Sequence, residues 1–500
     1  MSVQDQDAAQ PLVVPGKNCW RIARAGRATV VVDAASYYHF VREAMEQAER
    51  RILLIGWDFD VRIPLEPDDK GQGESLGQFM LRLAREKPDR DIAILKWSFG
   101  ALKQWLRPSA AVMLIRWART KAIRYRFDSA HPPGCSHHQK IVVIDDCFAV
   151  CGGIDMSTAR WDTCDHNDDE PRRKLVNGKA YPPWHDVTML LDDQAAVALS
   201  DLSRDRWQRA TGDAMDALPE APCHWPDDIE PMFRDVDVAI ARTRAEYEGA
   251  EEIREVEALW LDMIAAAKRF IYIENQYLTN GKVAAAIAER MAEADPPEII
   301  VVMPRTADGW LEQRAMDAAR VRLARAIGKV DCHNRFRIYV PVTKGGEDIY
   351  VHAKVAIVDD RILRVGSANL NNRSFGLDSE CDVVIDCALP ANAECGDQIK
   401  ALREQLMAEH LAVDPTDVAA KFEETGSLIA VIEACLGEGR KLDLLDLEKP
   451  GEFDKFIADN ELLDPESADA FLEPLNERSL WKSWRKGRAK IRARLGRGKR

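Results

Sequence analysis

The sequence predicts an α/β fold built from two similar halves. Residues 49–55 (ERRILLI) and 267–273 (AKRFIYI) each end an amphipathic helix and run into an apolar strand. Residues 91–97 and 298–304 form a second matching pair of strands further along each half. Strands that alternate with helices are typical of sheets linked by crossover connections. The pairing of these segments therefore predicts a duplicated α/β unit.

The strand that follows in each half is apolar throughout. Residues 141–144 (IVVI) and 355–358 (VAIV) are continuous apolar runs, which predicts strands buried on both faces. Each run is preceded by a His and a Lys two positions apart, so the two side chains point the same way.

One constellation occurs in both halves at identical offsets. The Lys follows the His by two positions, the Asp follows the Lys by five, and a small pair starts seven after the Asp. The members are His138, Lys140, Asp145 and Gly152-Gly153, then His352, Lys354, Asp359 and Gly366-Ser367. A single His-x-Lys-x4-Asp should arise by chance in roughly one chain of this length in thirty. Two copies with matching small pairs therefore indicate one site built by both halves.

The repeated residue types indicate chemistry at phosphorus. A neutral imidazole can attack as a nucleophile, and a second, protonated imidazole can donate its proton to a leaving alkoxide. The two lysines suit a phosphate, whose charge grows on the non-bridging oxygens in the transition state. A pair of core histidines or a His/Asp metal site are the alternatives, but two ammonium groups would repel a bound cation.

These residues resemble the phospholipase D superfamily, whose signature is two His-x-Lys-x4-Asp motifs. The flanking runs are similar to its eukaryotic-type branch, and the resemblance covers about residues 30 to 410. The runs are 152–162 (GGIDMSTARWD), 183–187 (PWHDV), 271–277 (IYIENQY), 366–374 (GSANLNNRS) and 378–380 (DSE).

The resemblance implies a duplicated phospholipase D-like sandwich, with two lobes related by a pseudo-twofold, one shared active site and a helical C-terminal region. It implies that His138 is the nucleophile and forms a phosphohistidine, and that His352 is the acid and then the base. The implied catalytic set is His138, Lys140, Asp145, His352, Lys354 and Asp359, with support from Asn369, Ser367, Gly153, Asp186 and Glu380.

The resemblance also implies separate roles within this set. Asp186 orients His352, and Glu380 orients His138. Lys140, Lys354, Asn369 and Ser367 hold the phosphate oxygens. Asp145 and Asp359 are expected to be structural, bonding backbone near the motif loops. No metal or other cofactor is expected, because the lysines supply the positive charge.

The resemblance implies a phospholipase D that releases phosphatidic acid and a headgroup alcohol from glycerophospholipids, with transfer to another alcohol as a further outcome. A cardiolipin synthase-like phosphatidyltransferase is the alternative, disfavoured because no apolar run approaches the ~20 residues that span a bilayer. A nuclease of the superfamily and a non-catalytic membrane-binding protein are further alternatives. The four intact His and Lys residues argue against the last.

Charge is distributed unevenly along this chain of 500 residues. The net charge is −14, and residues 481–500 hold ten Lys or Arg and no acidic residue, so the first 480 residues carry −24. The acidic body should repel nucleic acid. Trp481, Trp484, Ile491 and Leu495 fall on one helical face, which favours a basic amphipathic tail on an anionic membrane surface. A solvated, disordered tail is the alternative.

The composition predicts a cytoplasmic monomer that associates peripherally with membrane. It is 46% hydrophobic and 30% charged, and residues 1–16 do not have the pattern of a signal peptide. The eleven cysteines are scattered without zinc-ligand spacing and are expected to be reduced thiols.

The expected organisation has six parts. A polar insertion at 165–183 either covers the site entrance or is a plain surface loop, and segments 418–436 and 453–475 are expected to be helical. The parts are an N-terminal extension (1–28), lobe 1 (29–218), a linker (219–250), lobe 2 (251–415), a helical C-terminal region (416–480) and the basic tail (481–500).

Overall fold

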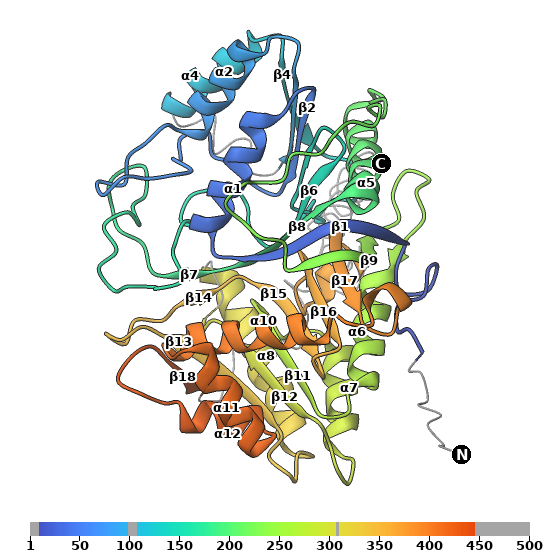
Figure 1. Ribbon diagram of the computed structural model, residues 1–500, viewed down its shortest axis with the longest axis vertical. Helices are drawn as coiled ribbons and strands as arrows, with labels where there is room; N and C mark the ends of the chain where they lie inside the picture. Colours follow the sequence, from blue (N-terminus) through green and yellow to red (C-terminus); the bar gives the residue numbers. More distant parts are fainter. Residues whose placement is uncertain (1–9, 99–107, 307–309, 446–500) are drawn as a thin grey trace, which may run out of the picture.

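The computed structural model describes residues 10–98, 108–306 and 310–445, and these form the expected α/β fold. A single large sheet runs through both halves of the molecule (Figure 1). Its order is β18-β13-β12-β11-β15-β16-β17-β9-β1-β8-β6-β5-β2-β3-β4, with β10 paired to β9.

Lobe 1 contains seven strands of this sheet among the described residues. Strands β2, β3 and β4 are parallel, and β5, β6, β8 and β1 continue the sheet from β2 as antiparallel neighbours. The strands are β1 (Arg21–Val32), β2 (Arg51–Gly56), β3 (Asp91–Trp97), β4 (Ile123–Asp128), β5 (Ile141–Ile144), β6 (Phe148–Gly152) and β8 (Val187–Asp192).

Lobe 2 repeats the same order and directions. Strands β11, β12 and β13 are parallel, and β15, β16, β17 and β9 follow from β11 as antiparallel neighbours. The strands are β9 (Phe233–Arg244), β11 (Phe270–Asn275), β12 (Glu298–Val302), β13 (Phe336–Val342), β15 (Lys354–Val358), β16 (Ile362–Gly366) and β17 (Glu380–Asp386), with β10 (Ile253–Arg254) and β18 (Lys441–Leu444) added at edges. The duplication predicted from the sequence is therefore present in the strand order, whereas the pseudo-twofold axis stays a prediction.

The lobes meet where β1 pairs antiparallel with β9 over residues 21–28 and 233–240. A separate two-stranded sheet, β7 (Trp184–His185) paired with β14 (Tyr350–Val351), crosses the same junction. The residue after β7 is Asp186 and the residue after β14 is His352, so this small sheet sets two predicted site residues side by side.

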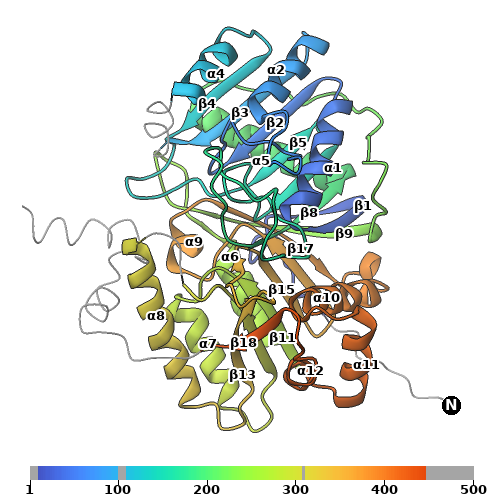
Figure 2. The same cartoon turned by 90° about the vertical axis from the view of Figure 1, so that its left-hand side faces the viewer.

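Helices cover both faces of the sheet (Figure 2). One face packs on α1, α2 and α4 in lobe 1 and on α6 and α7 in lobe 2. A core continuous through both lobes lies on the other face, under α5, α10, α11 and α12. The helices are α1 (Ala34–Gln47), α2 (Leu76–Glu86), α4 (Pro108–Ala118), α5 (Asp193–Thr211), α6 (Glu255–Ala266), α7 (Gly281–Met291), α8 (Trp310–Gly328), α9 (Asn372–Gly376), η2 (Pro390–Asn392), α10 (Gly396–Leu411), α11 (Pro415–Thr425) and α12 (Leu428–Ala434).

The expected boundaries differ from the structure at the lobe junction. β1 begins at Arg21, inside the expected N-terminal extension, and β9 lies within the expected linker 219–250. Both strands combine a buried stretch, residues 28–32 in β1 and 238–241 in β9, with polar side chains that are partly or fully exposed, so neither is apolar along its whole length as the central strands are. The strands β5 and β15 are fully buried, as predicted.

The C-terminal region is helical only in part. Gly426, with a φ of 65°, ends α11, so the helix expected over 418–436 is divided into α11 and α12, and strand β18 follows. The segment 453–475 and the tail 481–500 lie outside the described residues. Among those described, no helix has the length and hydropathy to cross a membrane.

Candidate active site

Each motif histidine is attached by its backbone to the opposite lobe. The His138 N–H donates to the Ser379 carbonyl at 3.0 Å, and the His352 N–H donates to the His185 carbonyl at 2.8 Å. The Ser136 N–H also donates to the Asp378 carboxylate, at 2.7 Å. Each motif histidine is therefore fixed by hydrogen bonds to the opposite lobe, and the site forms only where the two lobes meet.

Each histidine also has a carboxylate partner from the other lobe. His138 Nδ1 is hydrogen-bonded to Glu380 at 2.9 Å, and His352 Nδ1 is hydrogen-bonded to Asp186 at 2.7 Å. Both carboxylates are fully buried. Because Nδ1 of each ring is engaged, Nε2 is the nitrogen left to face a substrate.

The two carboxylates are held in different ways. Glu380 accepts hydrogen bonds from Ser367 Oγ at 2.5 Å and Ser374 Oγ at 2.6 Å, and burial raises its pKa to about 8. Asp186 accepts from the Val187 N–H at 2.8 Å, and burial raises its pKa to about 6. The Ser367 hydroxyl therefore supports Glu380, rather than reaching for a phosphate as the resemblance implied.

Gly153 is the counterpart of Ser367 in lobe 1, and the space around it explains the difference. A Cβ at Gly153 would lie 2.0 Å from Asp186 Oδ1, which is closer than any real contact. Glycine at this position lets Asp186 lie against the chain and reach His352. The difference between Gly-Gly and Gly-Ser in the two motifs follows from the different carboxylates they face.

Both lysines are buried beside the histidines. Lys140 Nζ donates to the His138 carbonyl at 3.0 Å and lies 3.2 Å from Asp155. Lys354 Nζ donates to the His352 carbonyl and to Gln276 Oε1, and burial lowers its pKa to about 7. Among the described residues no carboxylate lies within ion-pair distance of Lys354, so this ammonium lacks a counter-ion that an anionic substrate could supply.

The histidines themselves are kept neutral in the free protein. Desolvation, followed by the charge of Lys140, holds the pKa of His138 well below 6.5. Desolvation, followed by the charge of Lys354, has the same effect on His352.

Asn369 lies in a loop fixed by a buried ion pair. Asp382, paired with Arg364 at 2.6 Å, accepts from the N–H groups of Ser367 and Ala368. Asn369 Oδ1 is buried and makes no hydrogen bond. The backbone of this loop is therefore fixed around Asn369, whose Nδ2 group is the part of the amide that could donate to a phosphate oxygen.

Asp145 and Asp359 lie away from this group. Asp145 accepts the backbone N–H groups of residues 49, 50 and 51, and Asp359 accepts those of 268, 269 and 270. Each is separated from its motif Lys by a strand, a span of roughly 16 Å at the usual rise. Each aspartate links the end of a helix to the start of the next strand, which is a structural role. Neither aspartate contacts the histidine of its own motif.

Aromatic residues around the histidines were not predicted. Trp184 stacks on Tyr350 with ring centroids 4.5 Å apart and lies 5.2 Å from His352. Trp57 meets His138 edge-on at 6.5 Å. The Arg160 guanidinium lies 4.0 Å from the Trp184 ring centroid. Arg160 and Trp184 lie in the runs 152–162 and 183–187 that carry the resemblance, and this was the only indication in the sequence that they lie near the site.

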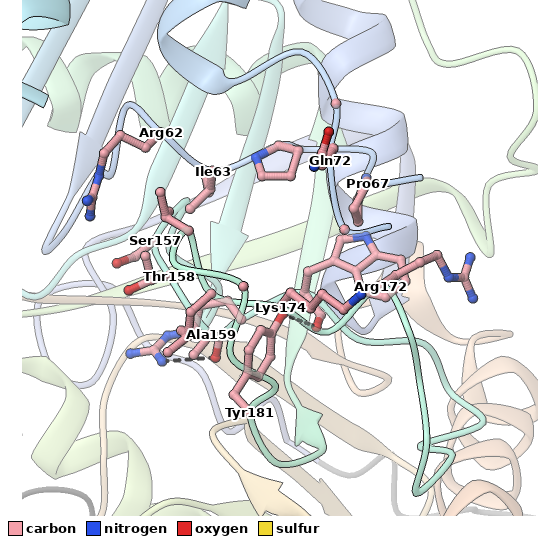
Figure 3. Close-up of a pocket in the computed structure, with 18 of the residues that line it drawn as sticks. Arg62, Ile63, Pro67, Gln72, Ser157, Thr158, Ala159, Arg172, Lys174 and Tyr181 are labelled. Carbon is pink, nitrogen blue, oxygen red and sulfur yellow. Dashed lines mark hydrogen bonds between the residues drawn. The ribbon is translucent and has the colours of Figure 1, made fainter. Parts of the chain in front are cut away.

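A pocket of about 440 Å³ has Arg160 in its lining, and Figure 3 shows other lining residues, among them Ser157 and Arg172. Its lining comes from the loop 62–73 and from residues 157–181, and it includes Lys174 and Tyr181. The insertion 165–183 therefore borders a cavity whose lining includes Arg160, which lies over Trp184 beside His352, while no motif histidine or lysine lines it. That it covers the entrance to the site stays a prediction.

A family model described as "Cardiolipin synthase, PLD-like domain" matches residues 260–403, which contain the second motif. Phospholipase D A of Dictyostelium discoideum is 25% identical over 412 residues, covering 69% of this chain and 31% of the relative. Phospholipase D1 of Saccharomyces cerevisiae is 24% identical, covering 77% and 29%. These matches show that the chain is similar to members of the phospholipase D superfamily.

Phospholipase D alpha 1 of Carica papaya is a further relative, 25% identical over 56% of this chain and 49% of its own length. The chain thus spans between 29% and 49% of the length of these curated relatives. The solved phosphatidylserine synthase of Haemophilus influenzae aligns with a TM-score of 0.54 at 12% identity, covering 83% of this chain and 97% of that one. That likeness concerns the fold.

Proposed function

We propose that the protein is a phospholipase D, which cleaves the distal phosphodiester of a glycerophospholipid to phosphatidic acid and a headgroup alcohol. The observation that carries the proposal is the pair of histidines, each hydrogen-bonded through Nδ1 to a buried carboxylate of the other lobe. Two imidazoles fixed in this way, between two lysines, suit double displacement at a phosphodiester.

In the proposed first step His138 Nε2 attacks phosphorus while His352 Nε2–H protonates the departing alkoxide. The products are a phosphatidyl-histidine and the free alcohol. Glu380 stabilises the positive charge that develops on the His138 ring. Lys140, Lys354 and the Asn369 amide donate to the non-bridging oxygens, and the phosphate charge restores the ammonium form of Lys354.

In the second step His352, now neutral, takes a proton from water, whose oxygen attacks phosphorus and displaces His138. Phosphatidic acid leaves and both rings return to their starting states. An alcohol in place of water would give a phosphatidyl alcohol by the same route. Two displacements in line predict net retention of configuration at phosphorus.

A cardiolipin synthase-like phosphatidyltransferase is the second candidate. The description of the family model that matches lobe 2 favours it, because it names that activity. The chemistry at the histidines is shared, and the acceptor alcohol alone would differ. A nuclease is disfavoured by the net charge of −24 on residues 1–480.

The test incubates the purified protein with phosphatidylcholine, phosphatidylethanolamine and phosphatidylglycerol vesicles, with and without ethanol or glycerol. Phosphatidic acid without added alcohol is the expected product. Cardiolipin from phosphatidylglycerol, without phosphatidic acid, would instead establish the transferase.

The nucleophile is tested separately by rapid quench with a labelled phosphatidyl group. The label should appear on His138 and accumulate in His352→Asn, in which release is slowed more than attack. Label on His352 in the unaltered protein, with none on His138, would reverse the assignment.

A further inference from the structure

A second cluster of histidines and carboxylates lies behind the active site and has no part in the proposed reaction. Its members are Asp33, His166, His185 and Glu409, all buried. They come from four separate segments: the residue before α1, the insertion 165–183, strand β7 and helix α10. Each offers one ligand atom, and these atoms lie within 4.8 Å of one another.

The distances between neighbouring ligand atoms are in the range expected around one small metal ion. Glu409 Oε1 lies 2.8 Å from His185 Nδ1 and 3.2 Å from His166 Nε2. Asp33 Oδ1 lies 3.4 Å from His185 Nδ1, and Asp33 Oδ2 lies 3.5 Å from His166 Nε2. Four ligands at zinc bond lengths of 2.0 to 2.1 Å would be about 3.3 Å apart.

Two of these atoms lack hydrogen bonds despite their burial. His185 Nδ1 and Asp33 Oδ2 make none, although both side chains are almost completely inaccessible to solvent. Buried polar atoms in folded proteins nearly always have a partner, and the groups that face these two are carboxylate oxygens and an imidazole nitrogen of the same cluster, which a shared cation would satisfy together.

The other nitrogen of each imidazole is held by a second carboxylate. His166 Nδ1 is hydrogen-bonded to Asp162 at 2.9 Å, and His185 Nε2 is hydrogen-bonded to Glu274 at 2.8 Å. This arrangement is the usual one for metal-binding histidines, because the outer carboxylate fixes the tautomer and the orientation of the ring.

The outer carboxylates are themselves anchored. Asp162 accepts from Arg173 Nη1 at 3.1 Å and from the Trp184 N–H at 2.9 Å. Glu274 accepts from the Tyr272 hydroxyl at 2.7 Å and is hydrogen-bonded to His410 Nε2 at 3.0 Å. The two imidazoles are thus preset by fixed groups on their outer sides.

We propose that Asp33, His166, His185 and Glu409 bind one Zn²⁺ in a closed tetrahedral site. Two imidazole nitrogens with two carboxylate oxygens suit zinc, whereas calcium and magnesium prefer oxygen ligands alone. All four coordination positions are filled by protein and the site is buried, so the ion is structural and not catalytic.

The site would stabilise the lobe junction next to His352. The Asp33 N–H donates to the Asp186 carbonyl at 2.8 Å, and the Asp186 N–H donates to Asp33 Oδ1 at 3.2 Å. An ion bound by Asp33 and His185 would therefore fix the segment that carries Asp186. It would also tie the insertion 165–183 and α10 to the same point.

A proton network is the competing account of the same residues. Two protonated imidazoles supply the same positive charge as a divalent ion with two neutral ones, so charge balance alone does not decide. In that account each imidazolium would donate to Glu409 Oε1, which lies 2.8 Å from His185 Nδ1 and 3.2 Å from His166 Nε2, so zinc retention is what decides between the two accounts.

The test measures metal and stability, so its result is independent of the proposed lipid chemistry. The full chain is loaded with Zn²⁺, freed of loosely held ion on a chelating resin and analysed by mass spectrometry for metals. It should retain about one zinc per chain, and His166→Ala and Glu409→Ala should retain less than about a tenth of that. His39→Ala is the control, because His39 also lies near two carboxylates, Glu66 and Asp228, but at the surface.

The melting temperature provides a second measurement that does not depend on the variants folding well. The metal-stripped wild-type chain should melt at a higher temperature after Zn²⁺ is restored, because an ion that binds only the folded state stabilises it. No retained zinc and no zinc-dependent shift would overturn the proposal in favour of the proton network. Preferential retention of Mn²⁺ or Fe²⁺ would overturn the assignment of the ion.

Discussion

At the residue scale, the motif residues could be predicted because their spacing is local and repeated. His138 and Lys140 are two apart in the extended segment just before β5, and His352 and Lys354 have the same spacing where β15 begins. Their carboxylate partners could not be found by spacing, since Glu380 and Asp186 come from the opposite lobes. Only the resemblance to the superfamily indicated them. The stacking of Trp184 on Tyr350 depends on pairing between lobes and left no local signal.

Gly153→Ala should disrupt the His352–Asp186 pair without touching either residue. The added Cβ would lie 2.0 Å from Asp186 Oδ1, so the carboxylate must move away from the imidazole. We expect kcat to fall by roughly 10²-fold or more, the contribution usual for acid–base catalysis. Gly281→Ala is the control, because nothing lies within 4 Å of its Cβ position. Unchanged kcat in a folded Gly153→Ala protein would contradict the role given to Asp186.

The pH dependence follows from the two neutral histidines. One must be neutral and one protonated, so kcat/KM should be bell-shaped in pH, with limbs that belong to the coupled pair. Desolvation and the lysines hold both pKa values below 6.5, so the protonated ring is lost as pH rises and the maximum should lie below pH 6.5. The anionic phosphate stabilises the imidazolium, so kcat should peak at a higher pH than kcat/KM. A kcat/KM maximum above pH 7.5 would show that the rings are not desolvated as described.

At the element scale, the central strands were predictable and the junction strands were not. β5 and β15 are apolar throughout and buried on both faces, so composition alone indicates them. β1 and β9 each include partly exposed charged residues beside their buried stretches and lie next to polar segments, so the sequence predicts an N-terminal extension and a linker where the structure has strands. Asp33, His166, His185 and Glu409 come from four segments far apart in the chain, so no sequence motif indicates that they form a cluster.

Asp145→Ala and Asp359→Ala should reduce stability more than activity. Each carboxylate accepts three backbone N–H groups where a helix end meets a strand. Losing this charged acceptor should lower the free energy of unfolding by about 1 to 3 kcal/mol, and by more at Asp145, whose donors are partly or fully buried, than at Asp359, where two of the three bonds are exposed; urea denaturation measures the difference. Asp68→Ala is the control. Asp68 accepts two backbone N–H groups in an exposed loop, so its replacement should lower the free energy of unfolding by less. A large loss of kcat at unchanged stability would place these aspartates in the chemistry after all.

At the scale of the whole molecule, the duplicated sheet explains why neither lobe has a site of its own. The strand order of lobe 1 recurs in lobe 2, and the two are joined edge to edge through β1 and β9. This pairing brings the starts of β5 and β15, with their histidines, to the same junction. The sequence predicts the repeat, but the long-range register that closes the site depends on contacts between segments far apart in the chain.

The charge of the whole chain leads to a prediction about membrane binding. Residues 1–480 carry −24 and should be repelled by an anionic vesicle, whereas residues 481–500 carry ten positive charges and two tryptophans. Each basic residue near such a surface contributes about 1 kcal/mol, so half of them would exceed the marginal binding of a single acyl anchor.

Deleting residues 481–500 should weaken binding to phosphatidylglycerol vesicles and make it less sensitive to salt, because fewer lipid counter-ions are displaced. Turnover of a soluble short-chain phospholipid should change little, since no residue of the site lies in the deleted segment. Equal vesicle binding by the full-length and truncated proteins at low salt would leave the tail as a solvated basic extension.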